Sequence, residues 1–548
     1  MMNRNDSKVF VVGIDGGCPE LIRDWTEKGE LPNIKMLMKD GASGELWSTI
    51  FPMTSTAWAS FMTGKNPGKH GIFDFIIRER NSYRFYPITS YPRKGEIIWN
   101  LIGGMNKRTT IVNVPLTYPP YIANGALISG YPTPESKKDY TFPKELLTEI
   151  ENEIGDYHIQ YKIEFNDNNG REFLDHVKYI VEKRALATKY LMNHKKWDFF
   201  MVHFQATDWI QHLFWKYMDE NHPDHNSNSP IYLKNAVLSI YRCVDRKIGE
   251  FLNELDGETY KIVMSDHGFG CLNKVVYLNN FFRRIGVLHF KKSFKYFLFK
   301  LGFTRENIYN SLLKLNLASL IPKYRDKKSE VFRFFLGLSD VNWNRTKVFS
   351  VGSNGQIFIN LKGREPDGIV ENGEEYSRLR EEMIRILERL KDPENNQRIF
   401  DKIYRKEEVY SGPYAYKAPD IVGLMTRYNQ ELNFNSTKIL GTSPEFLSGY
   451  HRMNGFILLN GPEVRKEREV SDVRIVDIAP TILYLMNVPI PEDMDGRPIL
   501  EAFEENYIKS HQVEYTRYIP KATQKHERLN GELEEEIKRR LKSLGYFS

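Results

Sequence analysis

Two pairs of ionisable residues have the types and spacing that a metal site requires. Asp208 and His212 lie four residues apart in ATDWIQHLFW, so on a helix both side chains would project from one face. Asp266 and His267 end the apolar run of YKIVMSDHG. Two adjacent polar side chains at the end of a buried strand are costly to bury unpaired, and a divalent cation would satisfy both. The alternatives are a helical Asp–His salt bridge and an ordinary turn with a surface histidine.

Two further residues would complete such a site. Asp15 stands in GIDGG, where glycines let the backbone bend sharply and approach a ligand, although the lysine of a Walker phosphate loop is missing. His451 precedes another apolar run in GYHRMNGFILL, where it is either a ligand or a structural loop residue. With Asp15 and His451 the set has three carboxylates and three imidazoles, which suit two zinc-like ions with open coordination positions.

Thr54 supplies a hydroxyl at the start of an expected helix, in TSTAWASFMTG. It is either a covalent nucleophile or a helix cap. Two cations about 3.5–4 Å apart can clamp the oxygens of an in-line phosphoryl displacement, and a hydroxyl bound to one of them loses its proton near neutral pH. In that case Thr54 would attack phosphorus, and water would later release the phosphoenzyme.

The sequence also predicts the sheet that would gather these residues. Four runs are typical of buried strands, namely KVFVVGID, RTTIVNVP, DFFMVHFQ and YKIVMSDHG. Helical spacing covers three long segments, 19–41, 172–193 and 231–255. Strands alternating with helices predict an α/β fold whose sheet is covered on both faces. In such sheets, ligand-binding residues collect at the carboxyl ends of the strands, where Asp15, Asp208 and the 266–267 pair fall.

Length and composition predict a globular chain of one large domain or two. The sequence has 548 residues, of which 41% are hydrophobic and 27% charged. A formal net charge of +6 is small for this length, so no nucleic-acid partner is expected. The three cysteines are too widely spaced for a disulfide framework or a CxxC metal knuckle. No signal-peptide core and no apolar run of about 18 residues is found, which predicts a soluble, cytoplasmic protein without a transmembrane segment.

Changes in composition suggest how the chain is divided. The expected parts are the first part of the α/β core, a basic helical insertion or lid, the second part of the core and a C-terminal helical tail, at 1–282, 283–345, 346–500 and 501–548. Residues 286–328 carry ten Lys or Arg and two Asp or Glu, so this stretch is a solvated amphipathic insertion, a lid over an anionic substrate or a membrane-surface contact. Leu533, Ile537 and Leu541 recur every four residues and predict a docked terminal helix.

With these motifs in order, the chain resembles the type I phosphodiesterase/nucleotide pyrophosphatase branch of the alkaline phosphatase superfamily. It is most similar to prokaryotic members described as predicted phosphohydrolases or phosphomutases. The matching blocks are VVGIDGG, FPMTSTAWASFMTGKNPGKHGIFDF, VNVPLTYPP, TDWIQHLFW, MSDHGFG, IFINLKGREPDGIV, GYHRMNGF and DIAPTILYLMNVPIPEDMDGRPI. The resemblance implies an alkaline-phosphatase-like fold, with a mixed, mostly parallel central sheet, helices on both faces and a helical insertion.

The resemblance also implies roles for the candidate residues. Thr54 would be the nucleophile, nine residues before Thr63. One ion would be held by Asp15, Thr54, Asp266 and His267, and the other by Asp208, His212 and His451. The ions would be zinc, with manganese or magnesium as alternatives.

Some positions depart from the family pattern or keep two interpretations. Nucleotide pyrophosphatases carry an Asn donor three residues after the nucleophile, where this chain has Ala57. Loss of such a donor typically costs about 10²–10³ in rate, so another group replaces it or the substrate is not a nucleotide diester. Arg364 is either a bidentate contact to the substrate phosphate or leaving group, or part of a structural salt bridge. Trp58 either stacks on the substrate or packs in the core.

The expected function is that of a metal-dependent phosphohydrolase that cleaves an anionic, small-molecule phosphoester through a phosphothreonine, with diesters favoured. One alternative is a phosphomutase, which would return the phosphoryl group to its substrate and would need the basic insertion to exclude water. The other is a non-catalytic anion-binding protein that keeps the shape of the site.

Overall fold

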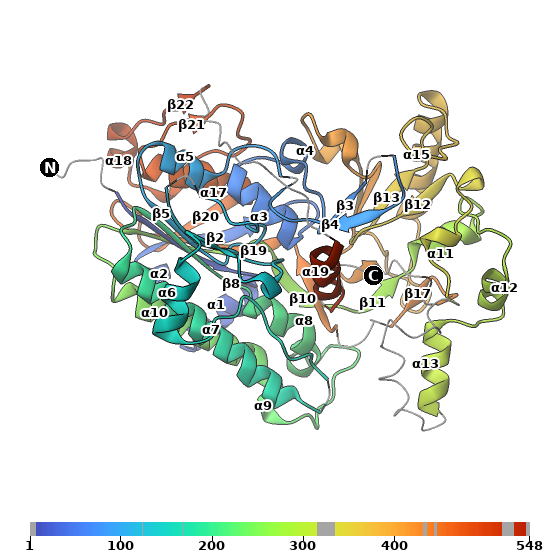
Figure 1. The fold of residues 1–548 in the computed structure, drawn as a ribbon, viewed down its shortest axis with the longest axis horizontal. Coiled ribbons are helices and arrows are strands. Elements are labelled where there is room, and N and C mark those ends of the chain that lie inside the picture. Colours follow the sequence, from blue (N-terminus) through green and yellow to red (C-terminus); the bar gives the residue numbers. More distant parts are fainter. Residues whose placement is uncertain are drawn as a thin grey trace.

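A nine-stranded sheet forms the centre of the computed structural model (Figure 1). The structure describes residues 7–314, 335–430, 434, 436–442, 447–517 and 531–543, apart from positions 80, 92, 123 and 167. In spatial order the strands are β20 (Arg468–Arg474), β2 (Gly41–Trp47), β19 (Asn454–Asn460), β9 (Tyr260–Met264), β1 (Val9–Ile14), β8 (Phe199–Phe204), β5 (Thr109–Val112), β6 (Gly125–Ile128) and β7 (Thr141–Phe142).

The middle of this sheet is parallel. β1 pairs in parallel with β8 on one side and with β9 on the other, and β5 continues the parallel order to β6. β19 runs antiparallel to both β9 and β2, and β7 closes the other edge antiparallel to β6. All residues of β1 and β8 are buried, as expected for strands covered on both faces. The predicted mixed, mostly parallel sheet is confirmed.

Helices cover both faces of the sheet (Figure 1). One face carries α1 (Pro19–Glu27), α2 (Pro32–Lys39), α6 (Leu146–Ile154), α7 (Gly170–His194) and α10 (Ala236–Leu252). The other face carries α3 (Thr54–Thr63), α5 (Ile98–Gly104) and α17 (Ile478–Leu485). The segment 19–41 forms two helices because Gly29 adopts a φ of 75° and Pro32 begins a new first turn. The segment 231–255 likewise divides, into α9 (Ile231–Lys234) and α10.

A smaller lobe lies beside the main sheet (Figure 1). Its antiparallel sheet has the order β12 (Val348–Ser350), β13 (Gln356–Ile359), β15 (Ile421–Leu424) and β14 (Lys402–Arg405). It packs with α11 (Leu278–Arg284) and α15 (Glu374–Glu388) around a hydrophobic cluster separate from the main core. We call this unit the second lobe. The second lobe includes residues from both sides of the boundary expected between positions 345 and 346. That boundary stays a prediction.

The basic insertion and the C-terminal tail are described in part. In the insertion the structure places α12 (Phe294–Lys300) and α13 (Arg305–Lys314), and residues 315–334 lie outside the described residues. In the tail, α19 (Gly531–Ser543) buries the side chains of Leu533, Ile537 and Leu541. Figure 1 shows α19 beside β4 (Phe85–Pro87), which it contacts. Within the described part of the chain, no helix is both long and apolar enough to cross a membrane.

Candidate metal centre

The candidate residues come together where the parallel strands end. Asp15 directly follows β1, and Asp266 and His267 follow β9. Asp208 and His212 lie on α8 (Ala206–Met218), which begins just after β8. His451 lies on β18 (Gly449–Arg452), which pairs with β10 (Gly268–Cys271), and Thr54 is the first residue of α3. The structure therefore gathers all seven residues that the sequence singled out, and every one of them is buried.

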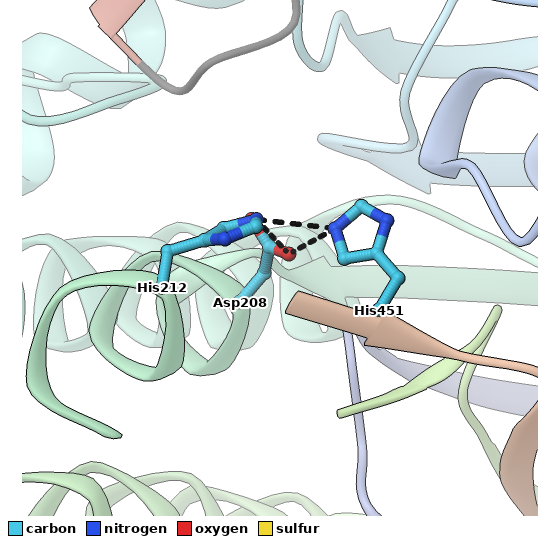
Figure 2. Close-up of side chains that lie close together, drawn as sticks. All are labelled: Asp208, His212 and His451. Atoms are coloured by element: carbon cyan, nitrogen blue, oxygen red, sulfur yellow. Dashed lines mark hydrogen bonds and ion pairs between the residues drawn. The ribbon is translucent and has the colours of Figure 1, made fainter. Parts of the chain in front are cut away.

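Three of these residues form a compact group of their own (Figure 2). Asp208 Oδ1 lies 3.3 Å from His212 Nε2 and 3.4 Å from His451 Nε2. The two imidazole Nε2 atoms are 3.1 Å apart. The spacing of four residues on α8 does place Asp208 and His212 on one face, and His451 approaches them from β18. One donor atom from each residue lies within 4.8 Å of the others, which is the arrangement of three ligands around one cation.

Thr54 belongs to the adjoining group. Its Oγ1 lies 3.2 Å from His267 Nε2 and 3.5 Å from Asp15 Oδ1. His267 Nε2 is in turn 3.3 Å from Asp266 Oδ2. Met53, not Thr54, occupies the N-cap position of α3, so the Thr54 side chain is free of the capping role that was its other interpretation.

The two groups share a residue. Asp15, Asp208 and His267 also have donor atoms within 4.8 Å of one another, so Asp208 belongs to both groups. The cluster is therefore continuous, and its geometry does not by itself divide the ligands into the two sets that the resemblance implies.

The imidazoles are oriented as metal ligands would be. In each case Nδ1 donates to a backbone carbonyl oxygen: His212 to Gly449, His267 to Gly268 and His451 to Pro52, at 3.0, 3.1 and 2.8 Å. The Nε2 atom of each ring is therefore turned into the cluster. Metal-ligating histidines are held in this way, with the non-ligating nitrogen fixed by an outer hydrogen bond. The Nε2 atoms of His212 and His451, 3.1 Å apart, are close enough to be ligands of one cation.

The pKa shifts and the burial of the carboxylates are also those expected of metal ligands. Burial, and then the like charges of Asp266 and Asp208, raise the pKa of Asp15. Burial raises the pKa of Asp266 to about 6 and lowers that of His267 to about 4. The pKa of Asp208 is held below its usual range by His212 and His451, although burial opposes this. Within the described residues, Asp266 Oδ2 and both Asp208 oxygens are buried without a hydrogen bond of good geometry. A divalent cation would compensate all of these groups.

One residue that contacts the cluster, His203, was missed by sequence reasoning. It lies on β8, where its Nε2 is 2.9 Å from Asp15 Oδ2 and its Nδ1 is 3.1 Å from Asn113 O. The only signal is a single polar residue within the apolar run FFMVHF. Trp58 contacts the same carboxylate, because its indole Nε1 donates to Asp15 Oδ2 at 3.3 Å. The Trp58 side chain is otherwise buried, with its ring edge-on to Phe61 and His203.

Arg364 lies in the second lobe and is engaged by carboxylates. Its Nη1 and Nη2 donate to the two oxygens of Asp420 at 2.8 and 2.6 Å, and its Nε donates to Glu365 at 2.9 Å. Nη2 also donates to the Ile359 carbonyl oxygen. These contacts are those of the structural salt bridge, which was the second interpretation of this residue.

Comparisons with known proteins agree with this architecture. The family model of type I phosphodiesterases / nucleotide pyrophosphatases matches residues 9–437. Phosphonoacetate hydrolase from Sinorhizobium meliloti 1021, in complex with phosphonoformate, aligns at 14% identity and a TM-score of 0.52, covering 88% of this chain and 96% of that chain. Human ectonucleotide pyrophosphatase / phosphodiesterase 5 aligns at 13% identity and a TM-score of 0.45, covering 88% and 95%. No curated protein matches the chain.

The mixed sheet, with a Thr, Asp and His cluster at the carboxyl ends of its strands, is an alkaline-phosphatase-like fold. At 14% identity the phosphonoacetate hydrolase structure supports the fold alone, whereas the family model assigns the family. The chain belongs to the type I phosphodiesterase / nucleotide pyrophosphatase family. It is therefore a hydrolase that acts on ester bonds, in a family of enzymes that use divalent metals.

Proposed function

We propose that this chain is a metal-dependent phosphohydrolase that cleaves an anionic, small-molecule phosphoester through a phosphothreonine at Thr54, with diesters favoured over monoesters. The observation that carries the proposal is the position of the Thr54 hydroxyl, 3.2 Å from His267 Nε2 and 3.5 Å from Asp15 Oδ1. Thr54 also opens α3, whose first N–H groups and positive dipole end favour an incoming phosphate.

Two divalent cations are part of the proposal, zinc first, with manganese or magnesium as alternatives. Asp15, Thr54, Asp266 and His267 would hold one of them, and Asp208, His212 and His451 the other. When bound, such cations lower the pKa of a hydroxyl and neutralise the charge that develops on a transferring phosphoryl group. The three Nδ1–carbonyl hydrogen bonds and the buried carboxylate oxygens support this assignment.

The residues of the chain would then carry out two displacements. Thr54 Oγ1 forms a bond to phosphorus as the bond to the leaving alkoxide breaks. The Thr54 proton passes to Asp15 Oδ1, the carboxylate oxygen that its hydroxyl faces, and from there to the alkoxide, which leaves as an alcohol. The backbone N–H groups of the first turn of α3 hold a phosphoryl oxygen. Water next attacks phosphorus, the P–Oγ1 bond breaks, and one proton of that water passes to Thr54 Oγ1 while its oxygen stays on phosphorus. A diester thus yields an alcohol and a phosphate monoester.

The test is a panel of p-nitrophenyl phosphate mono- and diesters, assayed with added zinc, manganese or magnesium. We expect turnover of diesters by the wild type and its loss in Thr54→Ala, with metal content unchanged. Acid-quenched enzyme should carry a phosphoryl adduct on the Thr54 peptide. Thr63→Ala is the matched control, because it removes a hydroxyl from the far end of the same helix, where it donates to Ala59 O. Thr54→Ala with wild-type turnover would refute the proposal.

The same assays separate the two alternatives. If labelled solvent oxygen does not enter the released phosphate and the phosphoryl group returns to the substrate, the enzyme is a phosphomutase. Stoichiometric metal without turnover of any phosphoester would favour a non-catalytic anion-binding protein.

A further inference from the structure

A loop of the second lobe reaches the start of α3. It spans residues 351–355, between β12 and β13. Gly352, Asn354 and Gly355 all have positive φ, of 87°, 57° and 65°. Asn is among the few residues that adopt this conformation at low cost, so the sequence VGSNG permits a tight turn at the tip of the loop.

Two buried polar side chains hold the loop in place. Asp74 Oδ2 accepts a hydrogen bond from Ser353 N at 2.8 Å. Gln430 accepts from Gly355 N at 2.9 Å and donates to Gly352 O at 3.1 Å. A Cβ at Gly352 would lie 2.8 Å from Asp74 Oδ2, so the approach is too close for a larger residue. The loop is therefore positioned from both sides by side chains that belong to other segments.

This positioning brings the Asn354 side chain against the residue that precedes the proposed nucleophile. Asn354 Nδ2 lies 2.9 Å from the sulfur of Met53, the residue that directly precedes Thr54. The Asn354 side chain also interacts with the Tyr450 phenol. Tyr450 directly precedes His451, and its ring stacks on the His451 ring with centroids 4.8 Å apart. Asn354 thus contacts the immediate neighbours of two cluster residues that come from different elements.

The Asn354 amide is buried, with 1% of the residue exposed. Its Nδ2 donates to the Met53 thioether sulfur, which is a weak acceptor, and the side chain also interacts with the Tyr450 phenol. A charged phosphoryl oxygen is a stronger acceptor for an amide N–H than a thioether sulfur. On α3, Ala57 faces the same side as Thr54 and offers no donor.

We propose that the Asn354 side-chain amide donates a hydrogen bond to a non-bridging oxygen of the phosphoryl group attacked by Thr54. This inference rests on the proposed function and adds a substrate-binding residue from the second lobe. The hydrogen bond strengthens as negative charge grows on that oxygen, so Asn354 acts mainly on the transition state. Removal of one such donor typically lowers kcat by about 10²–10³.

Two substitutions separate this role from a purely structural one. Asn354→Gly removes the amide and keeps the backbone unstrained, because glycine readily adopts a φ of 57°. Asn354→Asp keeps the shape of the side chain but replaces the donor with a negative charge that faces an anionic substrate. We expect kcat/KM to fall about 100-fold in Asn354→Gly and further in Asn354→Asp. A residue that only shaped the loop would give the opposite order, because Asp is nearly isosteric with Asn.

Orthovanadate, which mimics the trigonal-bipyramidal phosphorus, provides a readout independent of turnover. We expect its inhibition constant to rise in both variants in the same order, with metal content and unfolding midpoint close to wild type. Asn280→Ala is the matched control. Asn280 is a fully buried Asn of the second lobe whose amide donates to the carbonyl oxygens of Ser436 and Lys438. This variant should lose stability while its vanadate affinity stays unchanged.

The outcomes distinguish this inference from the proposed function. If the wild type turns over phosphoesters and needs Thr54, but Asn354→Gly stays within threefold of wild type, the role of Asn354 is refuted alone. The same conclusion follows if Asn354→Asp is the milder variant. If the wild type hydrolyses no phosphoester, or Thr54→Ala remains active, both proposals fail together.

Discussion

Replacing His203 tests whether the metal centre depends on a histidine that would not itself bind metal. His203→Asn ends the side chain near the present position of Nδ1, so it can still donate to Asn113 O but loses the 2.9 Å contact of Nε2 with Asp15 Oδ2. Asp15 Oδ2 then keeps only the Trp58 indole, at 3.3 Å, among the contacts described above. His203→Gln places an amide near the position of Nε2 and should restore the lost hydrogen bond.

The magnitude follows from that single contact. A hydrogen bond to a charged group contributes about 1.5–3 kcal/mol, and about 1.4 kcal/mol corresponds to a factor of ten in affinity. His203→Asn should therefore bind zinc about 10–100-fold more weakly, which is also the usual cost of removing a residue that supports a metal ligand. His203→Gln should recover most of this loss. The measurement is zinc affinity at neutral pH, by competition with a chromophoric chelator, together with kcat/KM.

The control is another buried histidine. His70 is also fully buried and also uses both ring nitrogens, with Nε2 2.9 Å from Ser60 Oγ and Nδ1 accepting from Ile72 N at 3.2 Å. His70→Asn should lower the unfolding midpoint without changing zinc affinity. If His203→Asn binds zinc as tightly as the wild type, or if the Asn and Gln variants have equal affinities, the contact of His203 with Asp15 does not contribute to zinc binding.

Two further predictions concern pH and the second lobe. Burial raises the pKa of Asp266 to about 6 in the metal-free protein, so zinc must displace a proton below this pH, and its affinity should fall about tenfold per pH unit there. Because the pKa of Asp266 is raised in the folded protein, its protonation stabilises the folded, metal-free protein at acid pH. The increase in Tm caused by zinc should therefore grow as the pH rises through 6. An increase that does not depend on pH would refute this. Arg364→Met leaves Asp420 with Lys406 at 3.1 Å as its remaining ion-pair partner and should cost about 3 kcal/mol in urea unfolding. The KM for a phosphoester should change less than twofold, and a large increase would instead place Arg364 on the substrate.

The sequence contains most of the information about the ligands but little about what supports them. Each ligand pair is recognisable because its members are close in the sequence and because carboxylates and imidazoles are rare at the ends of buried strands. These pairs are Asp208 with His212 and Asp266 with His267. The strands were predictable for the same reason, since β1 and β8 are nearly continuous apolar runs. His203 lies inside one of these runs, and only the register with β1 reveals that it faces Asp15.

The segment 19–41 shows a different limit of sequence reasoning. Its apolar residues keep helical spacing from α1 through α2, so periodicity alone predicts one helix. The break depends on the backbone, at Gly29 with a φ of 75° and at Pro32, whose ring cannot follow a continuing helical turn. Asn354 shows the same limit at long range, because its local sequence predicts a turn and says nothing about Met53.

In the proposed function, the first turn of α3 is the point at which both lobes contact the substrate. No member of the cluster lies between residues 268 and 450, so the groups that would hold metal belong to the main sheet and to β18. The second lobe contributes Asn354, whose Nδ2 lies 2.9 Å from the sulfur of Met53. A phosphoryl group on Thr54 would, under both proposals, have cation ligands of the main sheet and a neutral amide of the second lobe as neighbours. It follows that substitutions in the second lobe should alter the choice of ester and the rate while leaving metal binding unchanged.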